Sequence, residues 1–106
     1  MLEEENTNKF LENIKPLVEQ IALIHHKAYY EYKPQVETLI SAGVSDDIRI
    51  QHLLDCLLDH ACNDEVLFLY KKLCRYYWDI NPQATVDYVN YYREIWDNEE
   101  DNEFKN

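Results

Sequence analysis

The stretch that most constrains the fold is Ser45 to Cys62, SDDIRIQHLLDCLLDHAC. Ser45 precedes Asp46 and Asp47, so a hydroxyl can cap the first free N–H groups while two carboxylates meet the positive end of the helix dipole. At 100° per residue, the apolar residues share an arc about 140° wide, which is typical of a core-facing stripe. They are Ile50, Leu53, Leu54, Leu57, Leu58 and Ala61. We predict a helix that ends before Asn63.

The opposite face of this helix carries Arg49, His52, Cys56 and Asp59. His52 and Cys56 are four residues apart, a spacing that lets two side chains of one helix share a metal ion. Asp59, or His25 and His26 from the first helix, could join them. His60 cannot, because it lies about 12 Å along the axis from His52.

Other features of this face argue against a metal site or an active site. The sequence holds no CxxC or HExxH motif, and Cys62 points about 120° away from Cys56 if both lie on one helix. Cys56 has histidines one turn away on both sides, but no glycine-rich loop is present to build an oxyanion hole. We therefore predict no cofactor and no enzymatic activity. His52 and Cys56 remain the candidate ligands, and the face is expected to meet a second helix or a partner.

The first helix is predicted over residues 10–32. Its apolar residues alternate in steps of four and three: Phe10, Ile14, Leu17, Ile21, Ile24 and Ala28. Leu11, Val18 and Ala22 widen this face beyond a coiled-coil seam, which favours packing in a bundle. Pro16 is either a kink or a helix boundary.

Prolines and one glycine divide the rest of the chain. Lys33-Pro34 predicts a break followed by a short helix through Ile40, and Gly43 predicts a left-handed helix end. A helix over 64–79 has its core face on Val66, Leu69, Tyr70, Leu73, Tyr77 and Ile80. Asn81-Pro82 opens a last helix to about Asp97, with Tyr88, Val89, Tyr92, Ile95 and Trp96 on one side.

Links of two to four residues between helices favour an all-α, compact antiparallel bundle of four to five helices. We expect a frayed segment over 1–6, one domain over 7–97 and a disordered acidic tail over 98–106. No apolar run approaches the ~18 residues of a membrane span, and three cysteines without a framework spacing indicate reduced thiols. A cytoplasmic location without membrane contact is the expectation.

The net charge is −11, but most of it lies at the two ends of the chain. Residues 1–5 and 97–106 hold eight acids and one lysine (−7), so residues 6–96 carry only −4. Acidic ends are typical of solubility and disorder, or of a surface for a basic partner. An acidic protein that mimics nucleic acid is thus an alternative function, with Asp55 and Asp59 as its carboxylates.

One helix face combines aromatic and basic residues: Phe68, Lys71, Lys72 and Arg75, with Trp78 off the main apolar stripe. Aromatic and arginine side chains dominate the binding energy of protein interfaces. Because the rest of the chain would repel phosphate, we expect another protein rather than nucleic acid as the partner. A second copy of the chain is a further candidate.

Two segments, LCRYYWDINPQAT (Leu73 to Thr85) and YYREIWD (Tyr91 to Asp97), carry a family resemblance. They are similar to small uncharacterised acidic accessory proteins of conjugative and other mobile elements of Gram-positive bacteria. The resemblance implies a regulator or an inhibitor of a host or defence protein, and it assigns no functional residue. The leading prediction is a non-catalytic protein-binding module, and a metal- or thiol-dependent regulator is the second alternative.

Overall fold

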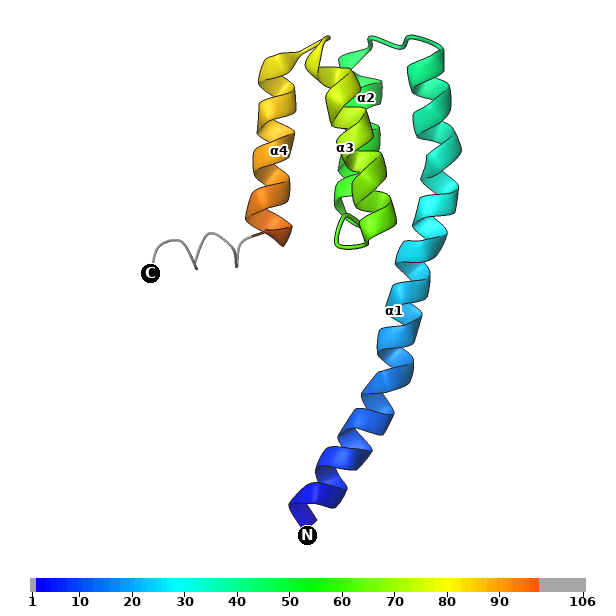
Figure 1. Ribbon diagram of the computed structural model, residues 1–106, viewed down its shortest axis with the longest axis vertical. Helices are drawn as coiled ribbons and strands as arrows, with labels where there is room; N and C mark the ends of the chain where they lie inside the picture. The colour runs from blue at the N-terminus through cyan, green and yellow to red at the C-terminus, as the bar shows by residue number, and fades with distance from the viewer. Residues whose placement is uncertain (1, 98–106) are drawn as a thin grey trace, which may run out of the picture.

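The computed structural model describes the backbone of residues 2–97 and the side chains of residues 9–97. These residues form helices without any strand (Figure 1). The elements are α1 (Leu2–Ser41), α2 (Asp47–Leu58), α3 (Asp64–Trp78) and α4 (Pro82–Trp96). The all-α class is therefore shown, with four helices in the described part of the chain. The acidic tail predicted over 98–106 lies outside the described residues.

The predicted core face of α2 is confirmed, but both of its predicted ends are wrong. Ile50, Leu53, Leu54, Leu57 and Leu58 are all buried, and so is Ala61 just beyond the helix. The N-cap is Asp46 rather than Ser45, because the extended Asp46 accepts a hydrogen bond from the Ile48 N–H at 3.0 Å. The helix stops at Leu58, so Cys62 lies in a turn outside it.

Helix α1 runs without interruption through both prolines, and the predicted break at Lys33-Pro34 is wrong. Proline removes one helical hydrogen bond and crowds the preceding turn. That local cost is offset because Val36 and Leu39, in the next turns, are buried in the core. The same contacts extend α1 to Ser41, after which Gly43 takes a positive φ of 66°, as predicted.

The N-terminal half of α1 leaves the body formed by the other helices and extends below it in Figure 1. Ala28 is buried at 5% exposure, whereas the stripe that precedes it from Phe10 to Ile24 is exposed. The prediction that this stripe faces a bundle core is therefore wrong for residues 10–24. Residues 2–6, expected to fray, belong to α1. The molecule measures 61 × 37 × 17 Å.

Helix α3 lies at the centre, because it packs against α1, α2 and α4. Its predicted core residues Val66, Leu69, Tyr70, Leu73 and Tyr77 are buried, and Ile80 is partly buried. Helix α4 is less deeply packed than predicted.

On α4, Tyr88 is buried, while Val89, Ile95 and Trp96 are exposed. Polar contacts add to the packing of Tyr88 and Ala84 against the core. The Tyr70 hydroxyl donates to the Tyr88 carbonyl oxygen at 2.6 Å, and the Trp96 indole N–H donates to the Leu58 carbonyl oxygen at 2.8 Å. In the described part of the chain, no helix is both long and apolar enough to cross a membrane.

Candidate functional site

The outward face of α3 gathers exposed aromatic and basic side chains, and we call it the basic–aromatic face. Its members lie within an arc of about 120° at 100° per residue. They are Phe68, Lys71, Lys72, Arg75 and Trp78, and every one is exposed. Phe68 is 63% exposed and Trp78 is 52% exposed, so neither ring completes the core. The sequence placed these residues correctly on one exposed face.

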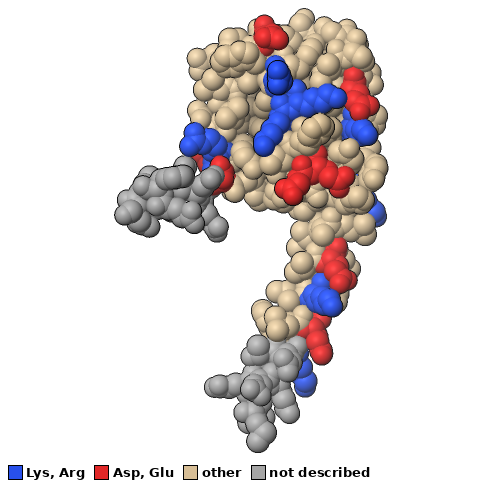
Figure 2. Space-filling view, viewed as in Figure 1, with Lys and Arg blue, Asp and Glu red and all other residues tan. Residues whose placement is uncertain are grey.

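The charges of this face have no acidic partner in the described part of the chain. The one ion pair between described residues joins His26 Nδ1 and Glu65 Oε1 at 3.1 Å and does not involve the face. Figure 2 shows Lys and Arg side chains gathered on the front of the helical body, the side on which α3 lies in Figure 1. A positive patch thus stands on a protein whose net charge is −11.

The rigidity of the basic–aromatic face follows from how α3 begins and packs. The Asn63 side chain caps the helix by accepting hydrogen bonds from the N–H groups of Glu65 and Val66, at 2.9 and 3.0 Å. Buried Leu73 and Tyr77 then anchor the inner side of the helix. An exposed face on a helix held in this way is presented in one orientation, which lowers the entropic cost of binding.

The two aspartates proposed for nucleic-acid mimicry have different surroundings. Oδ1 of Asp55 accepts a hydrogen bond from the Tyr88 hydroxyl at 2.9 Å, so this carboxylate faces α4. Burial raises the pKa of Tyr88, and the Asp55 carboxylate raises it further because it disfavours a second negative charge. Asp59 caps the end of α2 and is exposed. Asp55 is therefore already engaged within the fold.

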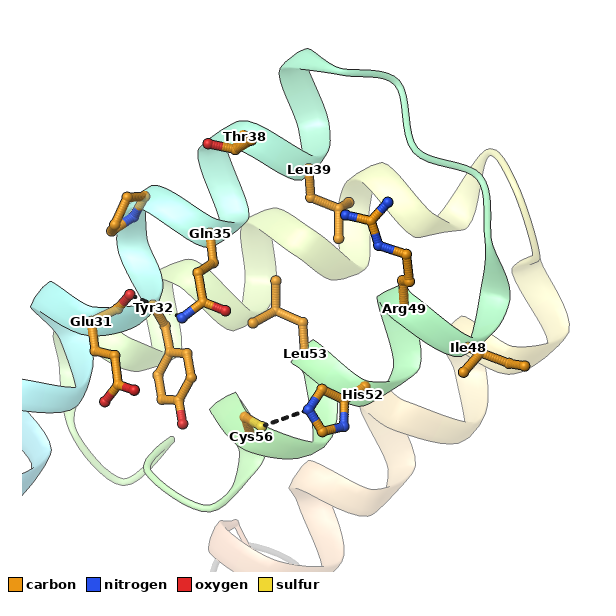
Figure 3. A pocket seen from close by; sticks show the side chains of 11 residues that line it. Glu31, Tyr32, Gln35, Thr38, Leu39, Ile48, Arg49, His52, Leu53 and Cys56 are labelled. Atoms are coloured by element: carbon orange, nitrogen blue, oxygen red, sulfur yellow. Dashed lines mark hydrogen bonds between the residues drawn. The ribbon is translucent and has the colours of Figure 1, made fainter.

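His52 and Cys56 do lie together, with Sγ of Cys56 3.9 Å from Nε2 of His52. They line an open pocket of about 850 Å³ between α1 and α2 (Figure 3). Tyr32 reaches Cys56 from α1, and its pKa is raised by burial and then by the neighbouring thiol. The predicted packing of this face against a second helix is met only at the half-buried Cys56, because Arg49, His52 and Asp59 are exposed.

A second cluster, at the start of α3, was missed by the sequence analysis. His25 Nδ1 lies 2.9 Å from His60 Nδ1, and His25 Nε2 lies 3.4 Å from Cys62 Sγ. His25 was expected near α2, but Cys62 was expected on that helix, where its side chain would point away from Cys56. The signal that could have found the cluster is the end of the leucine stripe, because residues beyond Leu58 need not follow helical spacing.

His25 joins the other two members of this second cluster, His60 and Cys62. The two ring nitrogens of His25 point to different neighbours, so His60 and Cys62 meet opposite sides of the ring. Among the described residues, no group of three or more histidine, cysteine or acidic side chains is arranged to hold a metal ion. Cys62 is a free, exposed cysteine, so its thiol is open to solvent.

Comparison with known proteins places the chain in no family. No protein-family model, no curated protein and no solved structure matches it.

Proposed function

We propose that this chain is a non-catalytic protein-binding module that docks on its partner through the basic–aromatic face of α3. The single observation that carries this proposal is a positive patch that lies between two exposed aromatic rings, Phe68 and Trp78, and has no ion-pair partner among the described residues. Large aromatic side chains cost free energy when left in water and supply binding energy when a partner covers them.

The side chains of the face also indicate which kind of partner it would bind. Three cationic side chains, Lys71, Lys72 and Arg75, would meet an acidic protein surface, and the flanking rings would fill shallow apolar hollows. A phosphate backbone would meet the same three cations, but the acidic remainder of the chain would repel it. An acidic protein is thus the partner we propose, in the cytoplasm.

The biological setting we propose is that of a mobile-element accessory protein which regulates or inhibits a host or defence protein. The resemblance of residues 73–85 and 91–97 to such accessory proteins supports it. The first of these segments includes Arg75 and Trp78, two members of the basic–aromatic face. The scaffold we propose is an antiparallel bundle that holds this face, with the N-terminal half of α1 projecting from it (Figure 1).

The test is quantitative capture of partners from cells of the source organism with the tagged full chain. Phe68→Ala and Trp78→Ala should each lower recovery of the specific partner at least about tenfold, as expected for interface hot spots. Ile48→Ala is the matched control, because Ile48 on α2 is 80% exposed and lies off the face. Circular dichroism of each variant verifies that the helices are intact.

The same capture separates this function from the alternatives. Nucleic-acid mimicry predicts that Asp55→Asn with Asp59→Asn abolishes recovery and that Phe68→Ala has no effect. A metal- or thiol-dependent regulator predicts sensitivity to His52→Ala and Cys56→Ser and to a chelator or a thiol reagent. Either pattern, or equal recovery with Phe68→Ala and Ile48→Ala, would contradict docking through the basic–aromatic face.

A further inference from the structure

The N-terminal half of α1 carries an apolar stripe that no other described part of the chain covers. We call the stripe the α1 seam. Its members are between 36% and 62% exposed: Phe10, Leu11, Ile14, Leu17, Val18, Ile21 and Ile24. The next residue of the same apolar face, Ala28, is buried in the core. The seam is thus a continuation of the core face into the solvent (Figure 1).

A helix of this kind needs a partner. Isolated helices in water gain little from propensity alone, and Pro16 removes one hydrogen-bond donor from this one. Seven large side chains, each about half exposed, amount to several hundred Å² of apolar surface in each copy. Contiguous patches of that size mark interaction sites, and a standard interface uses ~800 Å² per partner.

The arrangement of charges on the same helix identifies the partner. With Ile14 and Ile21 at the first apolar position of the heptad and Leu17 at the second, the charged residues fall on the side away from the seam. These are Lys9, Glu12, Lys15 and Glu19. The positions that flank these two heptad positions hold only uncharged residues, Leu11 and Val18 on one side and Asn13 and Gln20 on the other.

Two copies related by a two-fold axis would therefore bring no like charges together. A charged partner would find no complementary charge next to the seam. We propose that the N-terminal half of α1 pairs along this seam with the same helix of a second copy.

The two helices of the pair run antiparallel. From Ala28 onwards the apolar face of α1 is covered by the chain's own core. In a parallel pair, the bundles formed by α2, α3 and α4 of the two copies would therefore lie at the same end of the interface. In an antiparallel pair, each flank of the helix meets the same flank of its copy. Leu11 and Val18 then meet apolar side chains, while Asn13 and Gln20 meet polar ones. The paired segment, residues 10–24, is about 21 Å long at 1.5 Å per residue.

Sedimentation equilibrium of the full chain over a range of concentrations tests the pairing, with Ile21→Glu and Leu23→Glu as a matched pair of variants. Both positions lie on the same turn of α1 and are about equally exposed, at 47% and 49%. Ile21 is in the seam, whereas Leu23 lies on the opposite side of the helix. Neither side chain is buried in the core, so circular dichroism should show that both variants fold.

We expect a wild-type dimer, at least a tenfold weaker dimer with Ile21→Glu, and no change with Leu23→Glu. A monomeric wild type, whose seam would then serve some other partner, would overturn the proposal. Equal effects of the two variants would overturn it as well. Because the seam and the basic–aromatic face are separate surfaces, neither result bears on the proposed docking through α3.

The direction of the pair is tested by a short amine-reactive crosslinker on mixed isotope-labelled and unlabelled chains. Lys9 and Lys27 are about 27 Å apart along one helix, too far for a short linker within one chain. A Lys9–Lys27 crosslink between copies supports the antiparallel arrangement. Lys9–Lys9 crosslinks without it would overturn that arrangement.

Discussion

The hydroxyl of Tyr77 donates a hydrogen bond to Oδ1 of Asp47, and this contact joins the end of α3 to the start of α2. The same oxygen accepts a bond from Nδ2 of Asn81, the residue that caps α4. One carboxylate therefore links three helices at one end of the fold. These donors hold the pKa of Asp47 below its ordinary value, first through Tyr77 and then through Asn81.

Tyr77→Phe should make the protein less stable at pH 7 and flatten its acid response. A carboxyl group whose pKa is lowered in the folded state stabilises the fold above the ordinary aspartate pKa, about 3.9, and loses that contribution as the pH falls through the folded value. The wild type should therefore lose more stability between pH 5 and pH 2 than Tyr77→Phe does. Urea unfolding at each pH measures the difference.

The control for that measurement is Tyr76→Phe. Its hydroxyl donates to the carbonyl oxygen of Val44 at 2.7 Å, so its loss should cost about 1 kcal/mol without a change in acid response. An identical acid response in the wild type and Tyr77→Phe would show that Asp47 does not link the helices electrostatically.

Leu54→Ala should lower the free energy of unfolding by about 2–5 kcal/mol. Leu54 has no exposed surface, so the smaller side chain leaves a cavity in the core. Ile48→Ala, on the exposed side of the same helix, should change stability by less than about 0.5 kcal/mol. Chemical denaturation measures the free energy of unfolding of both variants. Similar losses of stability in the two would mean that α2 does not form the core.

Pro34→Ala should raise stability by about 1–3 kcal/mol, because alanine restores the helical hydrogen bond that proline lacks within α1. Glu37→Ala, an exposed position one turn further on, should have an effect within about 0.5 kcal/mol. Thermal unfolding followed by circular dichroism compares the two. A loss of stability with Pro34→Ala would mean that the proline ring contributes more by packing than it costs the helix.

The three cysteines should react with a thiol reagent at different rates at pH 8. Cys62 is exposed and Cys56 is half-buried, whereas burial of Cys74 raises the pKa of its thiol to about 12. Two thiols should therefore react in the native protein and the third only on unfolding, which mass spectrometry of the labelled peptides can assign. Labelling of Cys74 at the rate of Cys62 would contradict its burial.

Alkaline pH should also destabilise the fold. A thiol whose folded pKa is raised stabilises the protein fully below its ordinary value of 9.0, and this contribution is lost as the pH rises towards about 12. Burial raises the pKa values of Tyr70 and Tyr88 too, so their ionisation favours the unfolded chain in the same way. Urea unfolding between pH 8 and pH 11 should show falling stability, and a constant midpoint would contradict this.

Local patterns predicted what depends on neighbours in the chain. The leucine stripe of α2 predicted its buried face, Asn63 and Asn81 stand at helix starts, and Gly43 takes the positive φ that a helix end requires. Each of these features depends on interactions within about one helical turn. The basic–aromatic face was predicted for the same reason, since side chains on one helix keep a fixed angular spacing.

What the sequence by itself determined was which face of each helix is apolar; only the tertiary structure decided what covers that face. The stripe from Phe10 to Ala28 has one period, yet Ala28 is buried and the α1 seam is exposed, because α2 and α3 are too short to reach it. Pro34 stays helical because burial of Val36 and Leu39 outweighs a local cost. Cys62 meets His25 because a turn between two helices, rather than helical spacing, sets its direction.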